Sequence, residues 1–176
     1  MKFLPTPVEG AYLIELEPHE DQRGSFARTF CQEEFEKMGL PTQIRQSNLS
    51  NNPHQGTLRG LHCQSEPHCE AKLVRVPRGS IYDVILDLRK DSPTYCQWFG
   101  SHLDDQDCKA IFVPGGVAHG FLTLVENTLI YYEMFEFYHP ESAWGIRYDD
   151  PLFDIHWPAE IKLISEKDQH WPNYQP

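Results

Sequence analysis

The chain has 176 residues, of which 15 are Lys or Arg and 26 are Asp or Glu, so its formal net charge is −11. This length predicts one domain, residues 1–176, and the acidic balance excludes nucleic acid as the main partner, because phosphate backbones attract positive charge. No apolar run approaches the ~20 residues of a membrane helix, so no membrane partner is expected. The N-terminal segment breaks at two prolines and is unlike a secretory signal.

The five cysteines are odd in number and form no C-x-x-C pair. Cysteines in this pattern are typical of a protein kept in a reducing compartment, where free thiols act as small buried hydrophobic side chains. We therefore expect a reduced, cytoplasmic protein.

Short runs rich in β-branched and aromatic residues recur along the chain and are separated by Gly, Pro, Asn and Asp. Several alternate with a period of two, as strands do. The segment Pro77–Ser80 between two such runs predicts a hairpin turn. We expect strands at Ala11–Leu16, Ser25–Phe30, Gln43–Asn48, Thr57–Gln64, Lys72–Pro77, Ser80–Leu88, Gln97–Leu103, Ala110–Val113, Gly120–Leu124 and Thr128–Phe137.

Helical signals are few. Residues Gln32–Met38 predict two turns that Gly39 ends, and Ser165 with Asp168 three residues later forms a capping signature. Many short strands with little helix predict a β-sandwich, a jelly roll or a small barrel.

Two histidine motifs are more specific. In the first, Gly56, His62, Gln64, Lys72 and Gly79 are separated by five, one, seven and six residues. The second reads Pro-Gly-Gly-Val-Ala-His over residues 114–119. Together they resemble the paired motifs of the cupin superfamily, although the step to the lysine is longer than in that pattern. The resemblance implies an all-β fold, the double-stranded β-helix or cupin jelly-roll barrel, with short peripheral helices.

The metal-ligand positions of the cupin pattern fall on His62, Gln64, Lys72 and His119. A lysine ammonium has no lone pair and repels a cation, and a glutamine oxygen is a weak neutral donor. Two histidines are fewer than the three or four ligands of a tight zinc or iron site. We therefore expect no metal and no cofactor in this barrel.

Without a metal, His62 and Lys72 suggest proton-transfer chemistry. The ordinary pKa of histidine lies near neutral pH, so an imidazole can take a proton from carbon. Such a carbon is acidic only beside a carbonyl, and a nearby ammonium would stabilise the enolate that forms.

A closer resemblance extends over nearly the whole chain. Its most specific stretches are Leu58–Gln64, which reads LRGLHCQ, and Ala118–Phe121, which reads AHGF. Other matching segments are Asp21–Phe26, Gln46–Asn48, Lys72–Arg75, Asp83–Val84, Asp87–Arg89, Asp91–Thr94, Pro114–Val117, Trp157–Pro158 and Ser165–Asp168. With these segments the chain resembles the dTDP-4-dehydrorhamnose 3,5-epimerase family, whose members are metal-free cupins.

The resemblance implies inversion of two stereocentres beside a 4-ketone in a nucleotide-linked 6-deoxyhexose. No cofactor is needed, because the ketone is already in the substrate. His62 matches the family's catalytic base, and Asp168 matches the carboxylate that orients it. Tyr132 matches the general acid on the opposite face of the sugar, and Lys72 matches the group near the carbon-4 oxygen.

The resemblance also assigns substrate-binding positions, and arginines among them suit a diphosphate. These positions are Arg23, Arg28, Gln46, Asn48, Arg59, His119, Tyr138 and Lys167. We expect Arg23, Arg28, Arg59 and Lys72 to converge, which would reconcile an anionic nucleotide-diphosphate sugar with an acidic protein. Family members are homodimers that exchange an N-terminal strand, which would be Ser25–Phe30 here.

Three departures from the family pattern bear on specificity. Arg28 stands where a glutamate usually contacts the nucleotide, which suggests a base other than thymine or an added phosphate contact, with a solvated charge as the alternative. Ala143 replaces a common acidic residue, and the segment Asn51–Gln55 is one residue longer than usual.

One geometric question concerns the two site tyrosines. Tyr132 and Tyr138 would lie about 20 Å apart on a straight strand at ~3.3 Å per residue. Both reach one sugar only if the chain bends between them, and Tyr132 is the expected site residue if only one does.

Other functions remain open from sequence. Single 3- or 5-epimerases and sugar 3,4-ketoisomerases share the barrel, and the residues do not set the number of inversions. A non-catalytic sugar-binding cupin would need neither the acid nor the base. A metal-dependent cupin oxygenase is disfavoured by Gln64 and Lys72.

Overall fold

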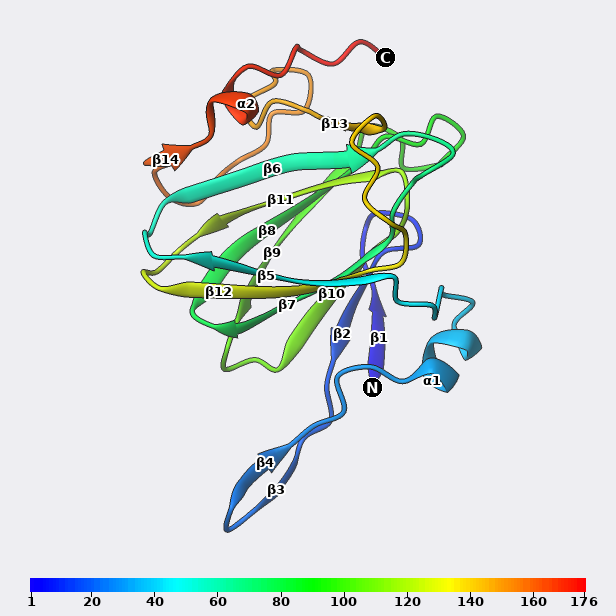
Figure 1. The fold of residues 1–176 in the computed structure, drawn as a ribbon, viewed down its shortest axis with the longest axis vertical. Coiled ribbons are helices and arrows are strands. Elements are labelled where there is room, and N and C mark those ends of the chain that lie inside the picture. The colour runs from blue at the N-terminus through cyan, green and yellow to red at the C-terminus, as the bar shows by residue number, and fades with distance from the viewer.

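The computed structural model describes residues 1–176 as two antiparallel sheets that face each other (Figure 1). The first sheet has the order β1 (Lys2–Pro5), β2 (Tyr12–Glu15), β10 (Lys109–Val113), β7 (Lys72–Arg78), β12 (Thr128–Met134) and β5 (Gln46–Asn52). The second has the order β13 (Ala143–Gly145), β6 (Thr57–Gln64), β11 (Val117–Thr123), β8 (Ser80–Asp87) and β9 (Trp98–Asp104), with β14 (Leu163–Ile164) alongside β6. This arrangement confirms the predicted all-β jelly roll.

Four smaller elements lie outside the two sheets. Strands β3 (His19–Asp21) and β4 (Gly24–Phe26) pair only with each other, and their hairpin projects away from the body in Figure 1. Helix α1 is Gln32–Lys37 and helix α2 is Glu166–Gln169, both short and peripheral as predicted. Neither helix is long and apolar enough to cross a membrane.

The two sheets bury a shared core between them. Val74 on β7 and Ile111 on β10 pack with Ile85 on β8 and Phe121 on β11. The outer face of the second sheet is covered as well, because the C-terminal segment runs over it (Figure 1). Strand β8 is therefore buried on both sides, which explains why polar residues on it must find partners in the interior.

The C-terminal segment also places α2 beside β6. Ser165 caps the helix as predicted, since its Oγ accepts a hydrogen bond from the Asp168 backbone N–H at 3.1 Å. Strand β14 pairs in parallel with the start of β6, with Ile164 opposite Leu58. This pairing places Asp168 of α2 beside β6, the strand that carries His62.

The predicted hairpin at Pro77–Ser80 is wrong. Strand β7 pairs with β10 and β12, whereas β8 pairs with β11 and β9, so the chain passes from one sheet to the other at Gly79. Gly79 has a φ of 89°, and a Cβ there would meet the Thr128 side chain. A jelly roll joins consecutive strands in this way, and local turn residues do not distinguish such a crossing from a hairpin.

Four predicted strands differ from the structure by more than one residue at an end. The strand expected at Gln43–Asn48 is β5 at Gln46–Asn52, and β11 begins earlier than predicted, at Val117. The strand expected to reach Phe137 ends at Met134. Of Ser25–Phe30, only the first two residues are strand, because the chain after Phe26 has no partner strand.

Candidate active site

A cavity of about 770 Å³ opens beside β6 and β12 and is lined from both sheets and from the C-terminal segment. Eight of the twelve predicted site residues line it. These are Arg59, His62, Lys72, His119, Tyr132, Tyr138, Lys167 and Asp168. The fold therefore gathers residues that lie more than one hundred positions apart in the sequence.

His62 and Asp168 form a close pair in this cavity. The His62 Nε2 and the Asp168 Oδ1 lie 2.6 Å apart, and the Asp168 side chain is only 6% exposed, against 44% for His62. Trp171 Nε1 donates to the same carboxylate oxygen at 3.3 Å, and the Gly60 backbone N–H donates to the other at 3.4 Å. A buried carboxylate held in this way fixes the orientation of the imidazole.

The ionisation state of Asp168 sets the tautomer of His62. Burial alone would raise the pKa of Asp168, but hydrogen bonds from His62, Gly60 and Ser165 and the charge of His62 hold it below its ordinary value. The carboxylate is therefore ionised near neutral pH and accepts the proton on His62 Nε2. The lone pair of a neutral His62 is then on Nδ1, which makes Nδ1 the basic atom.

Lys72 begins β7, is buried and lines the same cavity. Its Nζ lies 2.9 Å from Glu70 Oε1 and donates to the His62 backbone carbonyl at 3.2 Å. The side chains of Lys72 and Glu70 are 8% and 5% exposed, so the pair is isolated from bulk water. Glu70 was not predicted, although residues two apart in an extended segment share a face, which is the signal that could have found it.

A second histidine–carboxylate pair lies on the neighbouring strands. His119 on β11 is directly opposite His62 on β6, and its Nε2 lies 2.7 Å from Asp83 Oδ2. Asp83 is fully buried, and its Oδ1 has no hydrogen-bond partner. Its role as a partner of His119 was also missed, although the alternation of β8 placed it on the same face as the core residue Ile85.

The two tyrosines both line the cavity because the chain bends after β12. Tyr132 lies within the strand, and burial raises its pKa, which the nearby Arg59 charge partly offsets. Tyr138 follows the end of β12 and is 56% exposed. Its backbone N–H donates to Gln46 Oε1 at 2.7 Å, so Gln46 holds the segment that carries Tyr138 although it does not itself line the cavity.

Arg59 lines the cavity and is exposed to solvent. Its Nε donates to Asn52 Oδ1 at 2.8 Å, and its guanidinium leaves other donors free. Asn48, on the same strand as Asn52, does not line the cavity.

Arg23 and Arg28 do not reach this cavity, so the expected convergence of four cations does not occur within one chain. Arg23 belongs to the projecting β3–β4 hairpin, is 89% exposed and binds only Asp21, with 2.6 Å between Nη2 and Oδ2. Arg28 follows the hairpin and lies 3.4 Å from Glu34. The cations that line the cavity are Arg59, Lys72 and Lys167.

Gln64, at one of the cupin ligand positions, is fully engaged by the backbone. Its Nε2 donates to the carbonyls of His68 at 2.8 Å and Phe137 at 3.1 Å. Its Oε1 accepts from the His139 backbone N–H at 2.6 Å. Gln64 is thus a buried link between two loops, and Lys72 is already paired with Glu70, so neither offers a lone pair to a metal in the barrel.

Comparisons with known proteins agree on one family. A family model described as dTDP-4-dehydrorhamnose 3,5-epimerase matches residues 5–175. An enzyme of that name from Methanothermobacter thermautotrophicus is 45% identical over 173 residues, covering 97% of this chain and 92% of the relative. The crystal structure of the Bacillus anthracis enzyme with TDP and PPi bound has a TM-score of 0.94 at 38% identity, covering 98% of this chain and 99% of that one.

A relative named for a single inversion also matches. A dTDP-4-dehydrorhamnose 3-epimerase from Streptomyces niveus is 35% identical over 170 residues, covering 96% of this chain and 82% of the relative. The comparisons therefore include both double and single epimerases.

Proposed function

Because the chain belongs to the dTDP-4-dehydrorhamnose 3,5-epimerase family, a family of isomerases of dTDP-rhamnose biosynthesis, we propose that it epimerises a nucleotide-linked 4-keto-6-deoxyhexose at carbons 3 and 5. The observation that carries this proposal is the His62–Asp168 pair, 2.6 Å apart in a cavity that Lys72 and Tyr132 also line. A base, a cation and a phenol around one cavity are what proton transfer beside a ketone requires.

His62 acts as the base in this proposal. Its Nδ1 removes the proton from the carbon beside the ketone, and Asp168 stabilises the imidazolium that results. Lys72 donates to the ketone oxygen as negative charge develops there. Tyr132 returns a proton to the opposite face of the carbon, and its raised pKa keeps the phenol protonated at rest.

The substrate is a nucleotide-diphosphate sugar. Arg59 and Lys167 supply positive charge on the cavity wall, and guanidinium groups bind diphosphates in a bidentate manner. His119 and Tyr138 contact the ligand from the same cavity. The Bacillus anthracis enzyme was crystallised with TDP and PPi bound, which supports a nucleotide ligand here as well.

We further propose a homodimer in which the β3–β4 hairpin of each chain reaches the cavity of its partner. The two strands of the hairpin pair only with each other, and Phe26 on β4 is 73% exposed. Exchange of the hairpins would bring Arg23 and Arg28, together with Gln46 and Asn48 of the receiving edge strand, to the nucleotide. Light scattering should give twice the 20.5 kDa chain mass, and a monomer would contradict this proposal.

Arg28 bears on which nucleotide is preferred. A guanidinium donates hydrogen bonds and does not accept them, so in the dimer it would bind phosphate or a base carbonyl. Competition among dTDP, CDP, GDP and UDP measures the preference. A strong dTDP preference that Arg28→Glu removes would contradict an altered base.

A cytoplasmic location is part of the proposal. All five cysteines are free in the structure, which suits a reducing compartment.

The deciding experiment is incubation with dTDP-4-keto-6-deoxyglucose in deuterated water, followed by NMR. Deuterium at carbons 3 and 5 supports double epimerisation. Deuterium at carbon 3 alone would support the single 3-epimerase, the alternative that the Streptomyces niveus relative favours. Absence of exchange with any nucleotide analogue would favour a sugar-binding cupin, and persistence of exchange in His62→Ala would show that another group is the base.

A further inference from the structure

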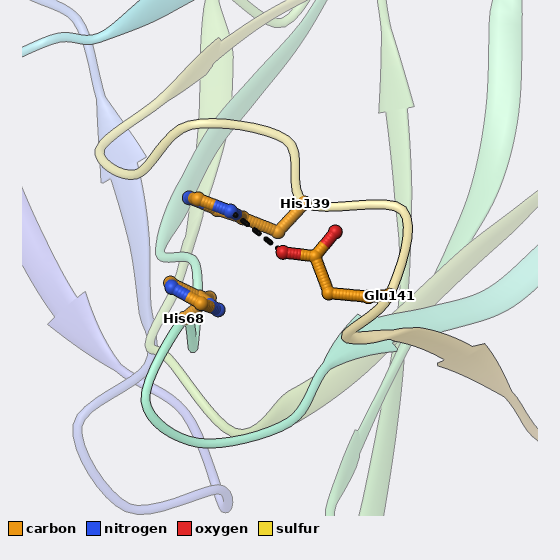
Figure 2. A group of neighbouring side chains, drawn as sticks. All are labelled: His68, His139 and Glu141. Carbon is orange, nitrogen blue, oxygen red and sulfur yellow. Dashed lines mark hydrogen bonds and ion pairs between the residues drawn. The ribbon is translucent and has the colours of Figure 1, made fainter.

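We propose that His68, His139 and Glu141, none of which lines the active-site cavity, form a zinc-binding site separate from the catalytic residues. His68 lies in the loop between β6 and β7, and the other two lie in the loop between β12 and β13 (Figure 2). One ligand atom from each residue lies within 4.8 Å of the other two. None of the three belongs to the cupin ligand positions.

The side-chain contacts leave one nitrogen of each ring available. His68 Nδ1 is 2.9 Å from Ser142 Oγ, and His139 Nδ1 is 3.2 Å from Glu141 Oε1. The Nε2 atoms of both rings have no hydrogen-bond partner within the chain.

The backbones of the two loops are fixed relative to each other. The buried Gln64 side chain accepts from the His139 backbone N–H and donates to the His68 carbonyl. The Ser65 backbone N–H also donates to the Ser142 carbonyl at 2.9 Å. A scaffold held in this way reduces the entropy lost when the side chains bind an ion.

The two imidazoles are stacked, with ring centroids 3.6 Å apart and an angle of 11° between the planes (Figure 2). Their lone pairs lie in the ring planes and therefore run parallel, so one ring must turn for both to bind one ion. His139 is the ring that turns, since its side chain is 30% exposed and its hydrogen-bond partner Glu141 is 67% exposed. Zinc would bind His139 Nδ1, with the ring proton moving to Nε2, or would bind Nε2 after rotation.

The donor set selects the class of metal. Two imidazoles and one carboxylate are a known set of zinc ligands, with water in the fourth position, whereas calcium and magnesium prefer oxygen ligands alone. The site does not depend on the proposed epimerase activity, because it uses no residue of the His62–Asp168 pair.

The test is calorimetric titration of chelator-treated protein with zinc chloride. We expect one zinc per chain in the wild type. His139→Ala and Glu141→Gln should each lower the zinc affinity at least about 10-fold, because even the loss of an outer-shell partner costs that much at a metal site. His156 and Asp154 provide a matched control, because they form an exposed histidine–carboxylate pair with His156 Nδ1 3.8 Å from Asp154 Oδ1. His156→Ala should leave zinc binding unchanged.

X-ray absorption of the zinc complex provides an independent readout, with two imidazole ligands expected in the wild type and one in His139→Ala. Circular dichroism shows whether each variant is folded. The proposal is overturned if no stoichiometric zinc binds, if His139→Ala binds as the wild type does, or if His62→Ala removes the zinc, which would place it on the catalytic histidines instead.

Discussion

At the scale of single residues, the contact between His62 and Asp168 makes the sharpest prediction. Asp168→Asn keeps the shape of the side chain but removes the charge that holds the proton on His62 Nε2 and stabilises the imidazolium. The turnover number should fall by about 10²- to 10⁴-fold, with little change in KM, because the interaction strengthens only as the proton is transferred. Steady-state kinetics with the keto sugar measure both constants. A turnover number within threefold of the wild type would show that Asp168 only supports the fold.

The Lys72–Glu70 pair allows catalysis and stability to be separated. Lys72→Met leaves the Glu70 carboxylate buried and unpaired, which should lower the free energy of unfolding by about 3–5 kcal/mol and abolish activity. The double variant Lys72→Met/Glu70→Gln removes both charges and should recover most of the stability while staying inactive. Urea denaturation and the NMR exchange assay measure the two effects. Recovery of activity in the double variant would show that Lys72 acts only through the fold.

Residues with reactive side chains are easier to predict from the sequence than the residues that support them. His62, Lys72, Tyr132 and Asp168 were predicted, and the structure brings all four to one cavity. The buried partners Glu70 and Asp83 were missed as site residues, because the sequence does not show which carboxylates in or beside a strand the fold will cover. Arg23 and Arg28 do not line the cavity of their own chain, and only the proposed exchange of hairpins would bring them to a cavity.

At the scale of elements, Asp87 connects the end of β8 to the loop that precedes β9. It is fully buried and accepts hydrogen bonds from Arg89, Ser92 and Thr94. Burial alone would raise its pKa, but these bonds lower it from 3.8 to about 2. The loop therefore depends on an ionised carboxylate.

Asp87→Asn should lower the free energy of unfolding by about 2 kcal/mol at pH 7, the stability that corresponds to the pKa shift. Because folding lowers the pKa of Asp87, its carboxylate stabilises the folded state fully above the unfolded pKa near 4. This stabilisation is lost as the pH falls through the folded pKa of about 2. About half of the difference between wild type and variant should therefore be lost at pH 3. Urea denaturation at the two pH values checks this, and a difference independent of pH would indicate lost packing instead.

The elements that sequence predicted best are those whose pattern is local. Strand β6 has the predicted boundaries because its apolar residues and the glycine before it indicate the same strand limits. The Ser165 cap was predicted because it depends on residues that are close together in the chain. The crossing at Gly79 and the end of β12 at Met134 depend on which strands become neighbours, which is a property of the whole fold. The same non-local pairing decides that Gly24–Phe26 forms only a two-stranded hairpin.

At the scale of the whole molecule, the net charge of −11 says little about the ligand. The cavity of one chain has three lining cations, and one of them, Lys72, is neutralised by Glu70. Arg59 and Lys167 alone are a small charge for a diphosphate. The projecting hairpin, with Arg23 exposed on it, is the element that would complete the positive surface from a second chain.

Mixing two inactive variants tests whether the active site is shared between chains. His62→Ala removes the base, and Arg23→Ala removes a hairpin cation that we expect to serve the partner's cavity. If the hairpins exchange, a mixed dimer holds one cavity with both residues intact, so random reassembly of an equal mixture should restore about a quarter of the wild-type activity. A control mixture combines His62→Ala with Asp168→Asn. Both residues lie in the cavity of one chain, so no cavity of a mixed dimer has both intact, and we expect this mixture to stay inactive. Recovery of a quarter of the activity would show that the two residues come from different chains. Activity of the first mixture equal to the average of its two parents would show that each chain binds substrate with its own hairpin or with none.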